Sequence, residues 1–277
     1  MRFFAPAKLN LSLDLGALRA DGYHEIRTVM QAVSLGDRLF VMPEGKFTVE
    51  NPLIREDDLV RRAGELFAQA TGRKAGVRIR VQKRIPIGAG LGGGSSDAAC
   101  TLRALRGLLR PDMPDAELLA LGAQLGSDVP FFLGPSPLAL AEGRGEILTP
   151  LSAREPLWAV IAWPGEGLST AAVYRDSAHG TGGATEQVLF GAACARNDLE
   201  AAAVRLSPAL QTLLRAAQAG GAPLQVTGSG SAAFALYKDA AAAGAGLHAV
   251  RFAAQRAVLC TTITAWPWQR IAAHGNE

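Results

Sequence analysis

Residues 83 to 102 carry five glycines between a stretch typical of a strand and one typical of a helix: Gly88, Gly90, Gly92, Gly93 and Gly94. Glycine loses more chain entropy on folding than any other residue, so such a cluster indicates a backbone that closely approaches something else. A helix that begins directly after the glycines places bare N–H groups and a positive dipole end there, which favours phosphate. The sequence therefore predicts a loop that binds a triphosphate.

The composition describes a globular chain with no charged arm. Of the 277 residues, 49% are hydrophobic and 19% charged, and the net charge is +3 without a long run of one sign. Neither a nucleic-acid partner nor a membrane partner is expected. No apolar stretch has the length of a membrane span, and no signal peptide is expected.

Cysteine and histidine give no sign of a metal site. The cysteines Cys100, Cys194 and Cys260 are scattered, as expected for buried reduced thiols of a cytoplasmic protein. The histidines form no paired or HExxH pattern, so no metal site of soft ligands is predicted.

Hydrophobic periodicity predicts an α+β protein. Residues 7–15 alternate between leucines and polar residues, and residues 76–82 alternate between β-branched residues and Arg or Gln. Because strand and helix patterns occur in blocks, partly solvated antiparallel sheets are favoured over a doubly wound parallel sheet. Other strands are expected near 23–34, 37–42, 46–50, 130–150, 157–163, 224–227, 232–237 and 257–265, and helices near 56–71, 96–109, 115–125, 197–219 and 239–255.

The apolar run at 157–163 indicates the start of a second lobe, which predicts domains at 1–155 and 156–277. Residues 165–187 contain five glycines and several Ser and Thr, and are predicted to be a long mobile loop.

Three common phosphate loops do not fit the context of the glycine cluster. Gly88, Gly90 and Gly93 match the dinucleotide fingerprint, but the preceding strand alternates with Arg and no acidic residue follows at the required distance. A Walker loop needs Lys before its final Ser or Thr, and that lysine is absent. The His-Arg-Asp and Asp-Phe-Gly partners of a protein-kinase loop are also absent. A plain glycine turn, with Ser95 or Ser96 capping the next helix, stays open.

Three separated motifs together resemble the GHMP small-molecule kinases. Residues 86–96 (PIGAGLGGGSS) resemble the second motif of that family, and two others follow the family order: PAKLNL at 6–11 and TGSGS at 227–231. The segments RADGYH at 19–24, GSDVP at 126–130 and AEGRGEILTP at 141–150 resemble the members that phosphorylate the 2-hydroxyl of 4-diphosphocytidyl-2-C-methyl-D-erythritol in the non-mevalonate isoprenoid pathway. The resemblance runs from about residue 5 to residue 237.

The resemblance implies a two-lobed GHMP kinase fold, with a ribosomal-S5-like N-terminal lobe and a ferredoxin-like C-terminal lobe. It also implies ATP as co-substrate, Mg²⁺ on the ATP phosphates, and a cytidine diphosphate-linked methylerythritol as acceptor. The oligomeric state expected is a monomer or weak homodimer.

By the same resemblance, Asp128 is the general base and Lys8 its charge partner. From the residues alone, Asp128 is better explained as a helix N-cap and Lys8 as a solvated lysine on an edge strand. A lysine next to the carboxylate would keep it ionised and offset charge on the transferred phosphoryl group.

The remaining site residues also follow from the resemblance. Those implied for ATP are Lys83, Pro86, Ile87, Gly88, Ala89, Gly90, Leu91, Gly92, Gly93, Gly94, Ser95 and Ser96. Those implied for the acceptor are Asn10, Tyr23, His24, Met30, Thr170, Tyr174, Gly228 and Ser229. Met30 departs from the family, which commonly has an aromatic residue there; its sulfur is able to pack against a ring. Ser96 or Asp97 are the side chains expected to approach Mg²⁺.

Two alternatives remain at this stage. One is another GHMP kinase acting on mevalonate, homoserine or a sugar, against which the Gly22-Tyr23-His24 sequence and the triple glycine argue. The other is a non-catalytic nucleotide-binding protein on the same fold, which the presence of both Lys8 and Asp128 disfavours.

Overall fold

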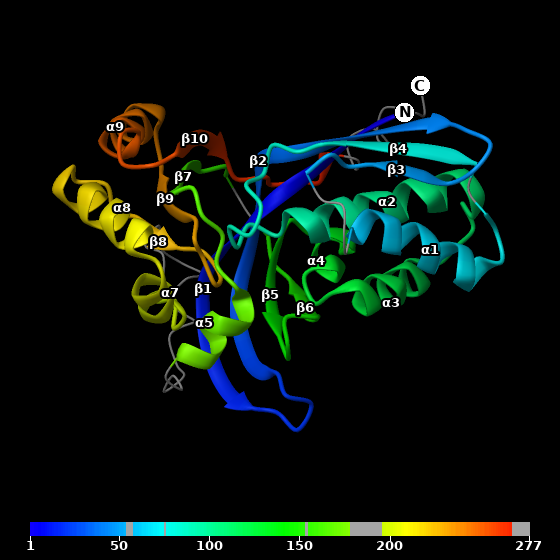
Figure 1. Cartoon of the computed structure of the whole chain (residues 1–277), viewed down its shortest axis with the longest axis horizontal. Helices are drawn as coiled ribbons and strands as arrows, with labels where there is room; N and C mark the ends of the chain where they lie inside the picture. The colour runs from blue at the N-terminus through cyan, green and yellow to red at the C-terminus, as the bar shows by residue number, and fades with distance from the viewer. Residues whose placement is uncertain (54–57, 75, 153–154, 178–195, 268–277) are drawn as a thin grey trace.

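The computed structural model describes residues 1–53, 58–74, 76–152, 155–177 and 196–267, whose strands form two sheets with helices packed against them (Figure 1). The first sheet has the order β3-β4-β2-β5-β6, with β1 paired to β2. Its strands are β1 (Arg2–Leu18), β2 (His24–Pro43), β3 (Thr48–Glu50), β4 (Val77–Gln82), β5 (Leu138–Glu142) and β6 (Ile147–Pro150). This arrangement confirms the predicted α+β class.

Strand β2 organises this sheet because it pairs with three others. It runs antiparallel to β1 along most of its length, to β5 through residues 28–31 and to β4 through residues 38–43. The register of β1 shifts at a bulge between Asn10 and Ser12. The alternating polar residues of β1 do not face solvent: Lys8, Asn10, Ser12 and Asp14 are all buried. The interpretation of Lys8 as a solvated edge residue is therefore wrong, since its side chain lines an internal cleft.

Four helices cover one face of the first sheet, as Figure 1 shows. They are α1 (Leu59–Thr71), α2 (Gly93–Leu109), α3 (Asp115–Leu125) and α4 (Val129–Leu133). Their apolar faces and the sheet enclose a core that contains Phe67, Leu102 and Phe131. Helix α1 begins at an Asp58 cap and ends at Gly72, whose φ of 67° confirms the predicted left-handed cap. Short strands were expected throughout 130–150, and for 130–133 this is wrong because α4 occupies them.

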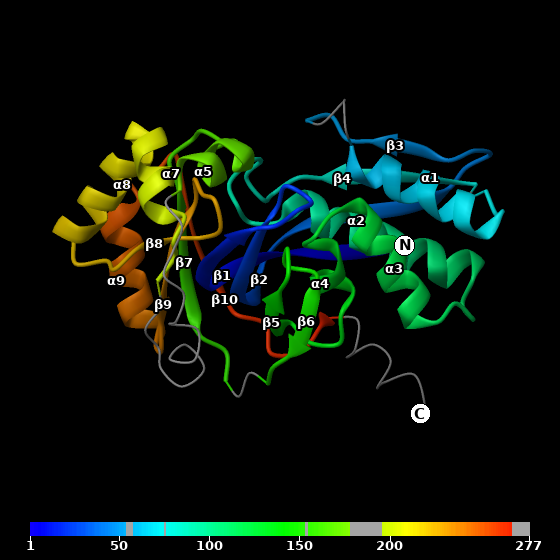
Figure 2. The ribbon, with the colours of Figure 1, turned by 90° about the horizontal axis from the view of Figure 1, so that it is seen from below.

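The second sheet has the order β10-β7-β9-β8 and is antiparallel throughout its described pairs. Its strands are β7 (Trp158–Trp163), β8 (Gln225–Val226), β9 (Ala233–Tyr237) and β10 (Arg256–Thr261). Helices α8 (Pro208–Ala219) and α9 (Ala240–Val250) pack against it on the side away from the first sheet (Figure 2). Helices α5 (Thr170–Asp176) and α7 (Glu200–Leu206) lie at its end nearest β1.

The prediction of a continuous loop at 165–187 is wrong for residues 170–176, which form α5. The Ser169 hydroxyl accepts a hydrogen bond from the Ala172 N–H and caps this helix. Residues 178–187 lie outside the described part of the chain.

The two sheets share a core, and the chain end returns to the first one. Ala89 and Leu91 of the glycine loop pack with Leu9, Ile161 and Phe234 of both sheets. After β10, Thr262 bridges to Val33 of β2. Trp266 is fully buried in the core under the first sheet, where its indole N–H donates to the Gly134 carbonyl at 2.9 Å.

Candidate active site

A lysine and an aspartate meet in the cleft between the glycine loop and β1. Lys8 Nζ lies 3.3 Å from Asp128 Oδ2 and donates to Asn10 Oδ1 at 2.6 Å. The Asn10 amide in turn donates to the Thr28 hydroxyl at 2.8 Å. The Lys8 side chain is 6% exposed and that of Asp128 is 26% exposed, so the carboxylate alone has substantial access to the cleft.

The local fold leaves the Asp128 carboxylate available for this pair. Asp128 occupies the N-cap position of α4, but its side chain makes no capping hydrogen bond. Pro130 sits in the first turn, where its missing N–H costs the helix nothing. The N-cap interpretation is thus correct for the backbone position and wrong for the side chain, which faces Lys8 instead.

The glycine loop passes so close to other backbone that side chains would not fit at its centre. A Cβ on Gly90, whose φ is +77°, would lie 2.5 Å from the Thr227 carbonyl oxygen. A Cβ on Gly92, with φ +69°, would lie 2.9 Å from Lys8 Cγ. Helix α2 begins at Gly93, and Gly92 occupies its N-cap without any side-chain cap, so neither Ser95 nor Ser96 is the cap. The N-terminus of this 17-residue helix therefore points its free N–H groups at the cleft.

The third motif closes the cleft opposite this loop. The Asn10 N–H donates to the Thr227 hydroxyl at 2.9 Å, and the Ser229 and Thr170 hydroxyls lie 3.1 Å apart. A Cβ on Gly228 would lie 3.0 Å from Asn10 Oδ1 and 3.7 Å from Lys8 Nζ. The 227–231 backbone thus lies close to the Lys8 ammonium.

The three motifs line one cavity of about 380 Å³. Its lining includes the catalytic candidates Lys8 and Asp128, every predicted ATP residue except Ser96, and the predicted acceptor residues Asn10, Met30, Thr170, Tyr174, Gly228 and Ser229. Ser96 is 1% exposed beneath the loop. Tyr23 and His24 do not line this cavity: Tyr23 lines an adjoining hollow of about 440 Å³, and the His24 ring packs 5.9 Å from that of Tyr174.

Tyr174 is neutral in this environment. Burial, with a smaller contribution from the Asp128 charge, raises the pKa of its phenol to about 12. Met30 is 1% exposed and belongs to the core, so it offers the cavity only a small apolar surface.

A buried ionic triad supports the glycine loop from below. Lys83 Nζ donates to Asp37 Oδ2 at 2.5 Å and to Asp97 Oδ2 at 2.8 Å, and all three side chains are at most 4% exposed. Asp37 also accepts the N–H groups of Arg84 and Ile85, which lead into the loop. Burial raises the pKa of Asp97 to about 8, against the opposing attraction of Lys83. The Lys83 ammonium is therefore held by carboxylates at the edge of the cavity.

Two family models match the sequence of this chain. Residues 58–134 match the model of the GHMP kinases N terminal domain, and residues 184–255 match that of the GHMP kinases C terminal domain. A 4-diphosphocytidyl-2-C-methyl-D-erythritol kinase of Geobacter sp. (strain M21) is 37% identical over 257 residues, which cover 88% of this chain and 91% of that one. The chain belongs to this family of GHMP kinases.

Two further relatives agree with the assignment. The enzyme of the same name from Geobacillus thermodenitrificans (strain NG80-2) is 46% identical over 179 residues, an alignment that spans 62% of this chain and 61% of the relative. A crystal structure titled 4-(cytidine 5'-diphospho)-2C-methyl-D-erythritol kinase superposes with a TM-score of 0.83 at 40% identity, covering 95% of this chain and 99% of that one. The predicted GHMP kinase fold is confirmed.

Three residues at or near this cavity were not expected from the sequence: Asp37, Asn197 and Arg144. Asp37 belongs to no recognisable motif, and only its distance from Lys83 in the fold reveals it. Asn197 holds the third motif in place, because its amide donates to the Val226 and Gly228 carbonyls at 2.9 Å each. Arg144 lies in the 141–150 segment that resembled the family, but the sequence assigned it no role; it lines the cavity beside Ser127.

The described residues contain no group of three or more His, Cys, Asp or Glu side chains arranged to hold a metal. Nor does any helix within them combine the length and apolarity that crossing a bilayer demands. Cys100 and Cys260 are free and buried as predicted, whereas Cys194 lies outside the described residues.

Proposed function

We propose that this protein transfers the γ-phosphoryl group of ATP to the 2-hydroxyl of 4-diphosphocytidyl-2-C-methyl-D-erythritol. The observation that carries the proposal is the Lys8–Asp128 pair, whose charged atoms lie 3.3 Å apart. The pair lies in a cavity that is also lined by the glycine loop at the N-terminus of α2. Phosphoryl transfer needs positioning, charge neutralisation and an acceptor for the hydroxyl proton. The cleft supplies a residue for each task, and the names of the relatives support the substrate.

Asp128 is the proposed acceptor of the hydroxyl proton. Its carboxylate is the partly exposed member of the pair, so an alcohol can reach it, while Lys8 remains buried behind it. The Lys8 ammonium keeps the carboxylate oriented and adds positive charge where the transferred group gains negative charge. The Asn10 amide holds the ammonium from the other side at 2.6 Å.

The ATP phosphates are proposed to lie over residues 86–96, at the N-terminus of α2. An adjoining hollow of about 740 Å³, which shares Lys83 with the cavity, suits the adenine base. It is lined by Phe40, Pro52 and Leu53, and by Asn51, whose buried amide has no hydrogen-bond partner among the described residues. A base with ring nitrogens and an amino group would satisfy that amide.

Mg²⁺ is proposed as the ion that neutralises the ATP phosphates. The protein ligand we propose is Ser96, whose hydroxyl has no partner in the part of the chain that the structure describes and offers a hard oxygen. Because Ser96 lies beneath the loop and outside the cavity lining, the glycine loop would have to shift for this hydroxyl to reach the ion. Most of the coordination would come from phosphate and water, because Mg²⁺ keeps several waters in such sites.

The direct test is a product assay with purified protein, ATP, MgCl₂ and the diphosphocytidyl substrate. A 2-phosphate product confirmed by mass spectrometry is the expected result. Parallel reactions with mevalonate, homoserine and galactose address the other GHMP activities, and turnover of one of them in place of the diphosphocytidyl alcohol would replace this proposal. ATP binding without turnover of any alcohol would indicate a non-catalytic protein.

Gly90→Ala is expected to raise the KM for ATP at least tenfold. The new Cβ would lie 2.5 Å from the Thr227 carbonyl oxygen and 2.9 Å from that of Gly230, so the loop has to move. The left-handed backbone adds roughly 1–2 kcal/mol of strain for a residue with a side chain. Initial-rate kinetics at varied ATP check the effect. Gly107→Ala, on the same helix-and-loop segment but with nothing within 4 Å of its Cβ, is the matched control and should leave the KM unchanged.

A further inference from the structure

The cavity contains an arginine that pairs with a carboxylate only through its Nε. The cationic side chains in its described lining are Lys8, Lys83 and Arg144. Lys8 faces Asp128 at 3.3 Å, and Lys83 is bonded to two carboxylates. Arg144 Nε lies 3.5 Å from Glu146 Oε1, a long contact, and its two terminal nitrogens have no hydrogen bond or ion pair among the described residues. Both terminal nitrogens of Arg144 are thus free to bind a ligand in the cavity.

Arg144 lies on the acceptor side of the cleft. It occupies the turn between β5 and β6, and this turn packs beside the catalytic aspartate: a Cβ on Gly145 would lie 3.9 Å from the Cβ of Ser127. The same point is 3.4 Å from Ile26 and 3.5 Å from Met30. The ATP phosphates proposed above lie on the opposite wall, over the glycine loop.

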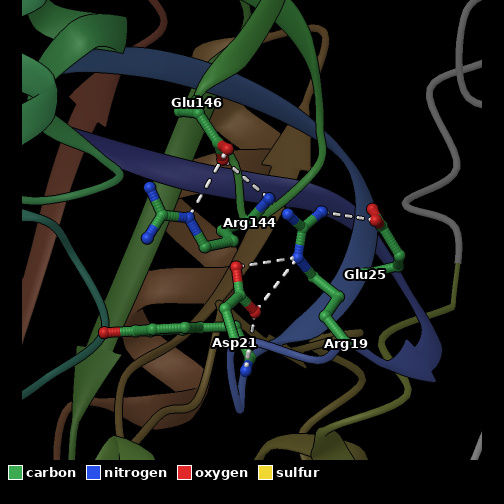
Figure 3. Close-up of polar contacts among 6 residues, drawn as sticks. Arg19, Asp21, Glu25, Arg144 and Glu146 are labelled. Atoms are coloured by element: carbon green, nitrogen blue, oxygen red, sulfur yellow. Dashed lines mark hydrogen bonds and ion pairs between the residues drawn. The ribbon is translucent and has the colours of Figure 1, made fainter.

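Polar contacts at the tip of the β1–β2 hairpin lie beside Arg144, as Figure 3 shows. Arg19 donates through Nε to both Asp21 oxygens, at 3.1 and 3.2 Å, and through Nη1 to Glu25. Asp21 also accepts the Tyr23 N–H at 3.2 Å, which fixes the tyrosine. The Arg144 guanidinium lies over the Tyr23 ring, 5.1 Å from its centroid. Stacking of this kind fixes the plane of a guanidinium and leaves its edge N–H groups available.

The Arg144 backbone is fixed as well. Its N–H donates to Glu146 Oε2 at 2.7 Å, and the preceding Gly143 carbonyl accepts the Ile26 N–H at 2.8 Å. A rigid turn, a stacked plane and two free terminal nitrogens are what bidentate recognition of a phosphate requires.

We propose that Arg144 binds the diphosphate of the acceptor substrate and thereby selects a nucleoside diphosphate-linked alcohol over a free one. This assignment rests on the proposed function, because it takes the acceptor to carry a diphosphate. The substrate brings two negative charges into a cavity where Lys8 and Lys83 already face carboxylates at 3.3 Å or less, whereas both terminal nitrogens of Arg144 are free among the described residues. Arg144 would therefore offset the cost of desolvating the diphosphate. Removal of its charge should therefore weaken the diphosphate contact and leave the nucleoside contact intact.

The test is calorimetric binding of CDP and of cytidine to wild type, Arg144→Met and Arg144→Lys. Arg144→Met is expected to weaken CDP binding about 10- to 100-fold, the usual range for a charge-assisted pair, and to leave cytidine binding unchanged. Arg144→Lys should recover part of the loss, because it keeps the charge without the planar fork. In steady-state assays the KM for the diphosphocytidyl substrate should rise and that for ATP should not.

Arg27→Met is the matched control. Arg27 is 44% exposed, pairs with Glu142 at the start of the same turn, and is absent from the described lining of the cavity, so the same charge change should leave CDP binding unaltered. Equal CDP affinity in wild type and Arg144→Met would overturn the role inferred for Arg144 but not the proposed function. Equal losses for CDP and cytidine would also overturn it, because they would show that Arg144 only supports Tyr23. A wild type that neither binds CDP nor turns over the diphosphocytidyl substrate would instead overturn the proposed function.

Discussion

Asp128→Asn is expected to lower kcat about a thousandfold while leaving ATP binding and the unfolding temperature close to those of wild type. General bases typically contribute 10²- to 10⁴-fold to a rate, and an amide cannot accept the hydroxyl proton. The substitution keeps the shape of the side chain, and α4 does not use that side chain as a cap, so the fold has little reason to change. Single-turnover phosphoryl transfer and calorimetric binding of a non-hydrolysable ATP analogue separate the two effects.

Lys8→Met should produce a loss of similar size, because the pair acts as a unit. If so, the double variant will be hardly slower than either single one, which is the signature of residues that serve one step. Asp112→Asn is the control: its carboxylate is 72% exposed and pairs with Arg110 on the surface. Turnover at the wild-type rate in Asp128→Asn or Lys8→Met would show that this pair is not the catalytic one.

Lys83→Met is expected to cause the largest loss of stability, about 3–5 kcal/mol, because it leaves the buried Asp37–Asp97 pair without its counter-ion. Asp37 and Asp97 would then face each other across a methionine, at side-chain exposures of 0% and 2%. The ATP site should weaken too, since Asp37 holds the N–H groups that lead into the glycine loop. Urea unfolding measures the first effect and the KM for ATP the second. The exposed Lys46→Met is the control, and a Lys83→Met protein as stable as wild type would contradict the argument.

Asp97→Asn tests the charge balance of the same triad through pH. The pKa of Asp97 is raised to about 8 in the fold, chiefly by burial, from the ordinary value of 3.8 that applies in the unfolded chain. Between these values the folded state binds more protons than the unfolded state, so wild-type stability should fall as the pH rises from about 5 to about 8. Asp97→Asn removes the titrating group and should flatten this dependence. Urea unfolding midpoints at pH 6 and pH 8.5 measure how the stability of each protein changes with pH. The same change in wild type and in Asp97→Asn would contradict the assignment.

Local patterns were sufficient for most elements and for the three family motifs. The alternation of Val77, Ile79 and Val81 correctly predicted β4, and the Gly72 stop correctly predicted the end of α1. The helix after the loop begins at Gly93, earlier than expected, because free N–H groups rather than a serine form its start. Residues 130–133 were mistaken for a strand region, since a five-residue apolar helix is too short to show a 3.6 period.

The contacts that define the site could not be read from the sequence, because they join distant segments. Lys8 is separated from Asp128 by more than a hundred residues, and only the family resemblance brought the two together. Asp37 and Asn197 have no motif at all; each is recognised by the backbone groups that it holds in the folded chain. Buried Lys8 also shows why a polar strand face need not be solvated: here it faces a cleft.

The position of Trp266 bears on how the protein is made. This indole fills the core under the first sheet, against the Phe131 ring at 5.8 Å between centroids, although it is synthesised after almost all of the second sheet. The N-terminal half therefore leaves the ribosome with a gap in its core, which closes only when the end of the chain arrives. Nascent chains arrested before residue 266 should accordingly be cleaved by protease more readily than chains that include it. The order of synthesis and the order of folding are thus coupled through the Trp266 side chain.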